Sequence, residues 1–228
     1  MIKTALPFLM SILPLAANYQ WSSVPIGGGG YVTGVVVHPR ERALVYIRTD
    51  VGGAYRWSEP ADAGGRHWIP LSDFVRWENG DFVSIDGLAV DPVDPEVVYV
   101  CAGNGQAEMS DVFKSSDRGV HWTRTHLDKL FHGNGGARWC GERIAVDPFD
   151  SRRVLVGTRR DGLWLNPAAG EPGAWSRLDG LPSTAGHVLV VCFDPLVRSR
   201  IYAGVANGGF HRSDDGGYRG KLLAALPT

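Results

Sequence analysis

A phrase built around an acid or a histidine before proline recurs four times along the chain, and it constrains the fold more than any other feature. Each copy reads as an apolar strand, this dipeptide, a short turn and a second apolar strand. The prolines, spaced roughly 50 residues apart, are Pro39, Pro92, Pro148 and Pro195. Such a period, with about four short strands per unit and no amphipathic helical pattern, is typical of a β-propeller. A β-sandwich is the competing architecture, but it does not explain the repeated phrase.

The chain is therefore predicted to be all-β, with about four β-propeller blades of four antiparallel strands. Thirty glycines and eight tryptophans among 228 residues fit many short strands and turns. We expect no helix after the first residues. The fourth copy is expected to stop early, because the sequence after Tyr218 lacks the tryptophan and the fourth strand of a complete unit.

A second pattern, Ser-x-Asp-x-Gly-x-x-Trp, is known as the Asp box. Residues 115–122 match all of it, and residues 213–217 match its first five positions. In such a turn the serine and aspartate side chains accept backbone N–H groups, glycine permits a positive φ, and tryptophan covers the blade edge. This local role favours a structural interpretation of Asp117 and Asp215 over a functional one.

Successive strand connections of a propeller blade lie on alternate faces of the ring. The acid-proline turns and the Asp boxes are predicted to share one face, and their turns are short. The turn 50–53 and the longer, irregular stretches are predicted to share the other face. Because loops on a rigid scaffold commonly carry function, we expect the site there. These stretches are residues 72–86, 103–111, 126–142, 159–162, 179–186 and 205–209.

Asp50 is the candidate catalytic residue on this face. It follows an extended run, residues 43–48, and opens an Asp-Val-Gly-Gly turn before the returning strand, residues 54–57. A carboxylate held on a rigid hairpin is the kind of group that glycoside hydrolysis uses. The alternative is an ordinary turn aspartate, because Asp-x-Gly-Gly is favourable turn chemistry.

Further residues are candidates for binding a sugar. Apolar faces of sugar rings pack on aromatic side chains, and sugar hydroxyls bond to polar groups at the ring edges. The candidates are Tyr55, on the strand that follows Asp50, and the loop residues Trp77, Asn134, Arg138 and Trp139. For Trp77 and Trp139 the alternative, that each caps the core beneath its loop, stays equally open.

The first residues resemble an export signal. Lys3 gives a short basic start, residues 5–17 are apolar apart from one serine, and small residues precede Asn18. The competing interpretation is a membrane anchor, but this stretch is shorter than the about 20 residues that span a bilayer. The expected organisation is a signal peptide, 1–17, followed by a partial N-terminal β-propeller domain, 18–228, in a secreted or periplasmic protein.

The net charge and the cysteine spacing argue against several classes of binding partner. A net charge of −1 with scattered basic residues argues against nucleic acid or an anionic membrane surface. The spacing of Cys101, Cys140 and Cys192 contains no zinc-binding pair, and the seven histidines show no ligand spacing, so neither a metal nor a cofactor is predicted. Cys101 and Cys192 lie in apolar runs and are interpreted as buried thiols, although one disulfide remains open.

Residues 31–57, from Tyr-Val-Thr-Gly-Val-Val-Val-His-Pro to Arg-Thr-Asp-Val-Gly-Gly-Ala-Tyr-Arg-Trp, closely resemble the N-terminal region of xyloglucanases of glycoside hydrolase family 74. Residues 141–148 and 161–164 resemble the same family. The resemblance implies two seven-bladed propellers with a cleft between them and inverting cleavage of the β-1,4-glucan backbone of xyloglucan. Asp50 matches the aspartate that serves there as catalytic base.

The chain departs from this family pattern in its length. It holds about four repeats where the family has fourteen, and the family's general acid comes from the second propeller, so no residue here corresponds to it. We therefore expect an N-terminal part of an incomplete seven-bladed propeller that carries the base without the acid. A polysaccharide is the expected partner, and the oligomeric state is not predicted.

Two other functions compete. The first is a non-catalytic Asp-box propeller that binds a glycan or a protein, as sortilin-like domains do, which fits a missing acid. The second is a sialidase, because Asp boxes occur there as well. Sialidases hold a carboxylate substrate with an arginine cluster and usually carry Arg-Ile-Pro near the start, which this sequence lacks. Arg159 and Arg160 are adjacent, so they would point to opposite sides of a strand.

Overall fold

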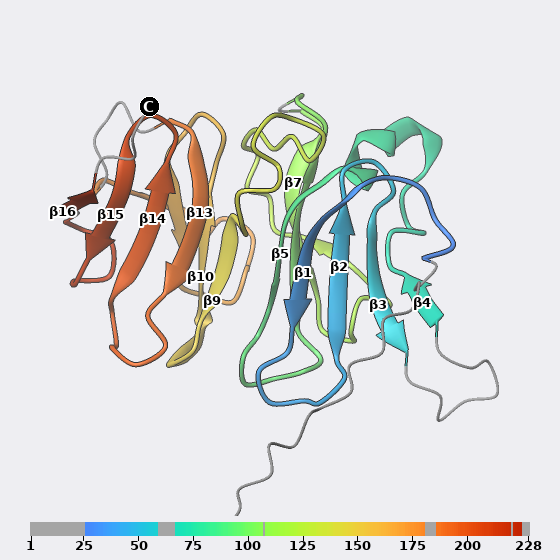
Figure 1. Cartoon of the computed structure of the whole chain (residues 1–228), viewed down its shortest axis with the longest axis horizontal. Coiled ribbons are helices and arrows are strands. Elements are labelled where there is room, and N and C mark those ends of the chain that lie inside the picture. The colour runs from blue at the N-terminus through green and yellow to red at the C-terminus, as the bar shows by residue number, and fades with distance from the viewer. Residues whose placement is uncertain (1–25, 59–66, 107, 181–185, 220, 225–228) are drawn as a thin grey trace, which may run out of the picture.

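The computed structural model describes residues 26–58, 67–106, 108–180, 186–219 and 221–224, and the predicted signal peptide lies outside them. The described residues form four separate four-stranded antiparallel sheets, each built from strands that are consecutive in the sequence. We call these sheets blades 1 to 4, and Figure 1 shows them side by side. The prediction of an all-β protein with about four blades of four antiparallel strands is confirmed.

Every blade runs from its first strand to its fourth without a crossover. Blade 1 consists of β1 (Val32–Val37), β2 (Val45–Thr49), β3 (Ala54–Ser58) and β4 (His67–Pro70). Blade 2 consists of β5 (Ile85–Val90), β6 (Val98–Gly103), β7 (Ser110–Ser115) and β8 (Thr123–Arg124). Blade 3 consists of β9 (Ile144–Asp147), β10 (Asp150–Gly157), β11 (Leu163–Asn166) and β12 (Ser176–Leu178). Blade 4 consists of β13 (Val188–Phe193), β14 (Ile201–Val205), β15 (Gly209–Ser213) and β16 (Lys221–Ala224).

Two sequence-based expectations are wrong. The fourth blade does have a fourth strand, since β16 pairs with β15 from Phe210 to Arg212. A strand edge is completed by backbone hydrogen bonds, which need no tryptophan. A helix also follows the first residues: η1 (Trp77–Val83) is a 3-10 helix in the connection between blades 1 and 2. Short 3-10 turns are common connectors and carry no amphipathic period that a sequence search would detect.

The hydrophobic core lies between the blades. One buried cluster joins residues of blades 1 and 2, a second joins blades 2 and 3, and a third joins blades 3 and 4. Strand β6 is buried at all six positions because its blade is covered on both faces. This explains why its sequence is a continuous apolar run instead of an alternating one. Strand β1 differs, since its residues 34 to 37 alternate between half-buried and exposed positions.

The two ends of the strands form two rims of different character. The proline rim carries the acid-proline turns and the Ser-x-Asp-x-Gly turns. There Arg118, in the second kind of turn, donates its N–H to the carbonyl of Glu96, in the first kind, at 2.8 Å. The loop rim carries the β2–β3 turn, η1 and the stretches that enter blades 2, 3 and 4. In Figure 1 η1 lies at the top and the β1–β2 connection at the bottom. For the described residues the predicted division of the loops between two faces is confirmed, while residues 181–185 of the predicted stretch 179–186 lie outside them.

The residue before each proline shapes its own turn. Asp91 Oδ1 accepts the N–H groups of Val93 and Asp94, and Asp194 Oδ1 accepts those of Leu196 and Val197. His38 does the same in blade 1 with Nδ1, which accepts the N–H groups of Arg40 and Glu41 at 3.2 and 2.9 Å. The repeated acid or histidine is therefore a turn device.

The Ser-x-Asp-x-Gly turns contain the hydrogen bonds predicted from their sequence. Ser115 Oγ accepts the N–H of Gly119 at 2.8 Å, and Asp117 Oδ1 accepts the N–H of His121 at 2.8 Å. Gly119 has a φ of 90°. Trp122 donates Nε1–H to the carbonyl of Leu71 at 2.9 Å and so ties the turn to blade 1. The turn at residues 213–217 repeats the serine contact to Gly217 at 2.9 Å.

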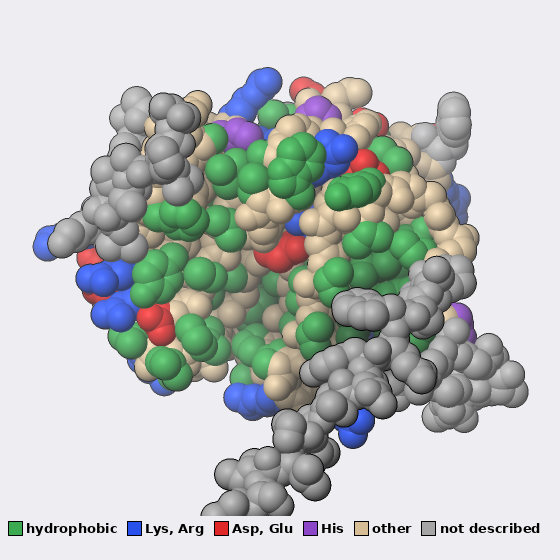
Figure 2. Space-filling view, viewed as in Figure 1, with side chains coloured by type: hydrophobic (Ala, Val, Ile, Leu, Met, Phe, Trp, Pro, Cys, Tyr) green, Lys and Arg blue, Asp and Glu red, His purple; other side chains and the backbone are tan. Residues whose placement is uncertain are grey.

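The first strands β1, β5, β9 and β13 line an open, largely apolar groove. Figure 2 shows apolar side chains gathered on this face of the molecule. Cys192 lies on β13 and is exposed, so its prediction as a buried thiol is wrong. The strand alternates, and Val191 and Phe193 on either side point into the core. Cys101 is buried as predicted, and all three cysteines are free.

Candidate functional site

The turn that carries Asp50 is closed by Thr49 and Gly53. Thr49 donates both its N–H and its Oγ1–H to the carbonyl of Gly53 at 2.9 Å, and Gly52 donates its N–H to Thr49 Oγ1 at 2.8 Å. Gly53 has a φ of 85°, in the left-handed region that glycine adopts without strain. The turn is therefore fixed by its own sequence, and Asp50 has a defined place on it.

The carboxylate of Asp50 lies at the loop rim and is 7% exposed. Its Oδ1 accepts the N–H of Tyr31 at 2.7 Å, and its Oδ2 lies 3.4 Å from Nε of Arg138. The backbone of Asp50 is also held, because its N–H bonds to the carbonyl of Tyr31 and its carbonyl accepts Ser84 Oγ–H at 2.6 Å. A carboxylate held this way has one oxygen committed to a backbone amide and the other turned toward an arginine.

Both partners of this carboxylate line an open pocket, together with Trp139. Tyr31 is 62% exposed and Trp139 is 60% exposed. The guanidinium carbon of Arg138 lies 5.0 Å from the centre of the Trp139 ring, within cation–π range. Two exposed rings, an arginine and a nearby carboxylate offer apolar faces and hydrogen-bonding groups together, which is what a sugar ring requires. We call this pocket, with Asp50 beside it, the Asp50 site.

The structure places the other predicted binding residues at different distances from this site. Asn134 is exposed and belongs to the same stretch before blade 3 as Arg138 and Trp139. Trp77 is the first residue of η1, on the connection between blades 1 and 2. Tyr55 is 6% exposed and sits on β3, where burial raises the pKa of its hydroxyl. Tyr55 thus forms part of the packing, and a contact between its ring and substrate stays a prediction.

Sequence reasoning missed a buried ionic group next to this site. Asp86 is fully buried and receives Nε and Nη2 of Arg159 at 2.7 and 2.8 Å, Nε of Arg143 at 3.1 Å and the N–H of His132 at 3.0 Å. Burial alone would raise the pKa of Asp86, but the hydrogen bond from Arg159 and the charges of both arginines hold it well below its ordinary value. The group is a paired charge network that joins blades 2 and 3.

Two histidines beside the Asp86 network have pKa values below their ordinary value. Burial is the largest cause for His132 and for His187, and repulsion from Arg159 and from Arg143 adds to it. Arg143 also donates to the carbonyl of Val188, at the start of blade 4. A sequence signal existed for this group, since Asp86 interrupts an apolar strand at the position of a β-bulge.

The turn of blade 3 that contains Arg159 repeats the geometry of the Asp50 turn. Thr158 donates its N–H and Oγ1–H to the carbonyl of Gly162 at 2.9 Å, and Asp161 donates its N–H to Thr158 Oγ1 at 2.8 Å. Arg159 therefore occupies the position that Asp50 occupies in blade 1. Blades 1 and 3 therefore have the same turn, which carries an acidic residue in blade 1 and a basic residue in blade 3.

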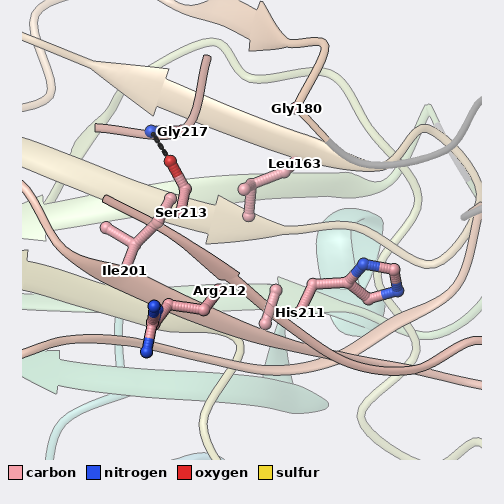
Figure 3. A pocket seen from close by; sticks show the side chains of 8 residues that line it. Leu163, Gly180, Ile201, His211, Arg212, Ser213 and Gly217 are labelled. Atoms are coloured by element: carbon pink, nitrogen blue, oxygen red, sulfur yellow. Dashed lines mark hydrogen bonds between the residues drawn. The ribbon is translucent and has the colours of Figure 1, made fainter. Parts of the chain in front are cut away.

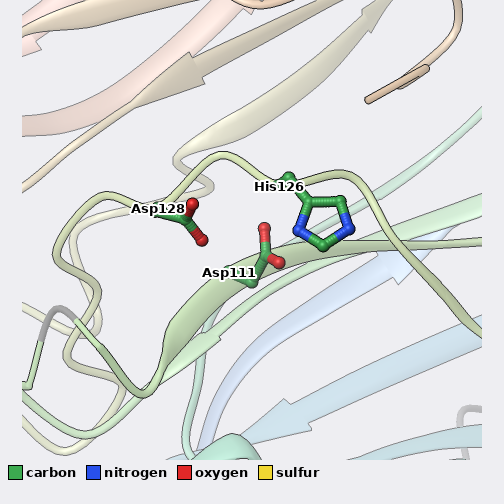
Figure 4. A group of neighbouring side chains, drawn as sticks. All are labelled: Asp111, His126 and Asp128. Atoms are coloured by element: carbon green, nitrogen blue, oxygen red, sulfur yellow. The ribbon is translucent and has the colours of Figure 1, made fainter. Parts of the chain in front are cut away.

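One group of side chains has the composition of a metal site. Asp111, His126 and Asp128 bring one ligand atom each within 4.8 Å of the others (Figure 4). However, Asp111 Oδ1 already accepts the N–H groups of Val112 and Leu127, and its Oδ2 receives Arg124 Nε at 2.7 Å. An arginine thus holds the place where a cation would bind, and the group is explained as a structural ion pair.

A small cavity between blades 3 and 4 is also structural. It is lined by Leu163, Ile201, Ala203 and His211, and the Ser213–Gly217 hydrogen bond lies at its wall (Figure 3). Its volume of about 10 Å³ is close to that of one water molecule, so it has no room for a sugar or a cofactor. Among the described residues, the helical segment found is too short and too polar to cross a membrane.

Comparison with known proteins places this arrangement in a class. No model of a protein family matches the chain. The xyloglucanase Xgh74A of Acetivibrio thermocellus is 34% identical over 249 residues, which cover 97% of this chain and 29% of that protein. A xyloglucanase of a Paenibacillus species is 35% identical, covering 98% of this chain and 24% of that protein. The chain thus spans less than a third of the length of these relatives.

Solved structures agree with the sequence comparison. The GH74 xyloglucanase of Xanthomonas campestris superposes with a TM-score of 0.79 at 37% identity, covering 92% of this chain and 32% of that one. The four blades therefore have the β-propeller fold of GH74 enzymes. Over nearly its whole length, the chain is a homologue of the xyloglucanases of glycoside hydrolase family 74, as the sequence resemblance predicted.

Proposed function

We propose that this chain supplies the general base of an inverting xyloglucan hydrolase, and that Asp50 is that base. The observation that carries the proposal is the Asp50 site itself: a carboxylate on a rigid turn, beside an open pocket lined by Tyr31, Arg138 and Trp139. In an inverting reaction a carboxylate takes a proton from water while a second carboxylic acid, about 6.5–9.5 Å away, protonates the leaving oxygen. We propose export to the cell exterior or the periplasm, where such a polymer is met.

The geometry supports the following roles for the residues of the site. Oδ1 of Asp50 is held by the N–H of Tyr31, so Oδ2 is the oxygen that can accept a proton from water. Trp139 and Tyr31 offer ring faces for sugar, and Arg138 offers hydrogen bonds to hydroxyl groups. We further propose that the general acid lies outside this chain, in a second propeller of the full-length enzyme. Trp77, Asn134 and Tyr55 remain proposed substrate contacts.

A glycan-binding module is the second candidate, because the pocket of Tyr31, Arg138 and Trp139 can bind a sugar without a general acid. The two functions make different predictions for Asp50, because hydrolysis needs its carboxylate and sugar binding does not. The experiment measures release of reducing ends from xyloglucan and affinity for xyloglucan oligosaccharides. It uses the wild type and Asp50→Asn, each joined to the second propeller of a full-length relative, which would supply the general acid.

The expected result is loss of hydrolysis with retained affinity in Asp50→Asn. The matched control is Asp161→Asn, which changes a carboxylate on the equivalent turn of blade 3 and should keep both activities. Hydrolysis that survives in Asp50→Asn overturns the assignment of Asp50. Binding without hydrolysis in the wild type joined to the second propeller favours the binding module.

A further inference from the structure

Arg48, like Arg143, is one of the two largest fully buried side chains of the described residues, and each of its three side-chain nitrogens has a hydrogen-bond partner. It lies on β2, two residues before Asp50. Its Nε donates to both carboxylate oxygens of Glu142 at 2.8 and 2.9 Å, and its Nη1 donates to Thr33 Oγ1 at 2.7 Å. A buried guanidinium with this number of hydrogen bonds holds its partner groups in place, because moving one of them would leave a buried N–H without an acceptor.

Two further bonds of Arg48 reach the loop before blade 3. Its Nη1 donates to the carbonyl of Arg138 and its Nη2 to the carbonyl of Gly141, both at 3.1 Å. These two carbonyls bracket the segment that contains Trp139. Arg48 therefore holds, from inside the protein, the backbone whose side chains line the Asp50 site.

Glu142 completes the attachment. Its Oε2 accepts the N–H of Leu88 on β5 at 2.6 Å, while its own carbonyl accepts the N–H of Val191 on β13 at 2.9 Å. The Arg48–Glu142 pair thus connects blade 1 to blades 2 and 4 at the inner strands. Burial raises the pKa of Glu142, and the charge and hydrogen bonds of Arg48 oppose that effect.

The backbone of β1 is adapted to this pair. A Cβ added to Gly34 would collide with Glu142 Oε1 and would lie 2.7 Å from Arg48 Nε. Gly34 has no positive φ that would require glycine, so the lack of a side chain serves the close approach of the pair. The register of β1 also shifts between Val32 and Gly34, which brings Thr33 to Nη1 of Arg48.

From these contacts we propose that Arg48 is a positioning residue: it sets the 138–141 loop so that Arg138 and Trp139 meet Asp50. Arg138 is the link, because its carbonyl is bound by Arg48 while its side chain contacts Asp50. Arg48 lies on β2 and Asp50 on the turn that follows it. Both residues that contact Arg138 therefore belong to one rigid hairpin. That Arg48 affects sugar binding rests on the proposed function, whereas its effect on the position of the 138–141 loop does not.

The experiment replaces Arg48 by Lys, which keeps the charge and loses the fork that binds two carbonyls at once. Glu142→Gln is the second variant, because it keeps the size and one acceptor for Arg48 if Arg48→Lys does not fold. Arg118→Lys is the matched control. Arg118 also joins blades 1 and 2 through two carboxylates, Glu41 and Glu96, but on the proline rim.

Three readouts are compared. Amide hydrogen exchange is measured for residues 136–141, the carboxyl ¹³C resonance of Asp50 is assigned by its loss in Asp50→Asn, and affinity is measured for a xyloglucan oligosaccharide. In Arg48→Lys we expect exchange to rise about tenfold or more and the Asp50 resonance to move, with affinity about tenfold weaker. Glu142→Gln should shift all three readouts in the same direction by less, and Arg118→Lys should leave them unchanged.

The outcomes separate the two proposals. A wild type that does not bind the oligosaccharide contradicts the proposed function, whereas the exchange and resonance measurements still test Arg48. A folded Arg48→Lys or Glu142→Gln with the wild-type loop exchange and Asp50 resonance overturns the positioning role. Equal changes in Arg118→Lys also overturn it, because they would show a general loosening of the blades.

Discussion

The Nε atom of Arg138 lies 3.4 Å from Oδ2 of Asp50, and this contact joins the β2–β3 turn of blade 1 to the loop that enters blade 3. The same turn in blade 3 presents Arg159, which binds the buried Asp86 of blade 2. An acid and an arginine thus form a pair twice at the loop rim. In blade 1 the acid lies on the turn, and in blade 3 the arginine does. The blade 1 pair lies beside an open pocket, and the blade 3 pair is closed inside the protein.

Removing the exposed ring of the Asp50 site should weaken sugar binding. We expect Trp139→Ala to bind a xyloglucan oligosaccharide about tenfold less tightly, because a ring of this size contributes on the order of 1–2 kcal/mol to stacking. Isothermal titration calorimetry measures the change. Tyr218→Ala is the control, since Tyr218 is 70% exposed but follows the Ser-x-Asp-x-Gly turn of blade 4 on the proline rim. Equal losses in both variants would contradict a specific site.

Removing the charge of Asp86 should destabilise the fold. Asp86→Asn leaves Arg143 and Arg159 buried without a full countercharge, and breaking a buried ion pair costs about 3–5 kcal/mol. Urea unfolding should show this loss in the free energy of unfolding. The comparison is Asp150→Asn, whose partner Arg152 is 74% exposed, and such pairs contribute about 0–1 kcal/mol. A loss in Asp86→Asn no larger than that of Asp150→Asn would refute the inferred cost.

Stability should fall when the pH drops below neutrality. His132 and His187 have lowered pKa values in the folded state, so as the pH passes their ordinary value of 6.5 the unfolded chain takes up protons that the folded chain does not. The free energy of unfolding therefore decreases with decreasing pH in that window. Urea unfolding at pH 7.5 and 5.5 measures the difference.

Replacing both histidines by Gln should reduce this pH effect. His121→Gln serves as the control, because the side chain of His121 is 86% exposed on the proline rim. A pH difference that is the same in the double variant and in the wild type would assign it to other groups. Below about pH 4 a second loss is expected, since the lowered pKa of Asp86 contributes stability only while the carboxyl is ionised in the unfolded chain as well.

Thiol chemistry checks the placement of the cysteines. In the native protein Cys140 and Cys192 are exposed, so a thiol reagent should modify two groups, and the third, Cys101, only after unfolding. Burial raises the pKa of Cys101 well above its ordinary value and slows its reaction further. Cys192→Ser should remove one of the two native equivalents. If only one thiol of the native wild type reacts, Cys192 is buried and its exposed placement is wrong.

The sequence was sufficient for the blades because their signals are local. The acid or histidine before proline and the Ser-x-Asp-x-Gly turn each satisfy hydrogen bonds within a few residues, as Asp91 and Ser115 do. Asp50 could be placed on the loop rim for the same reason, because the bonds that close its turn lie between Thr49, Gly52 and Gly53.

The remaining features depend on contacts between distant blades. Arg48 reads as an ordinary charged residue of a strand, and its partner Glu142 belongs to the connection before blade 3, so neither spacing nor composition joins them. Cys192 lies in an apolar run like Cys101, yet one faces the groove of the inner strands and the other faces a neighbouring blade. The strand β16 formed because the free edge of β15 accepts almost any backbone.

The described strands pair only with strands of their own blade, so chain order and spatial order coincide from β1 to β16. A segment of the loop rim can therefore lengthen, shorten or change its residues while every strand register stays the same. For the proposed function, this means that polymer preference can diverge through the loop rim alone, while the four sheets stay unchanged.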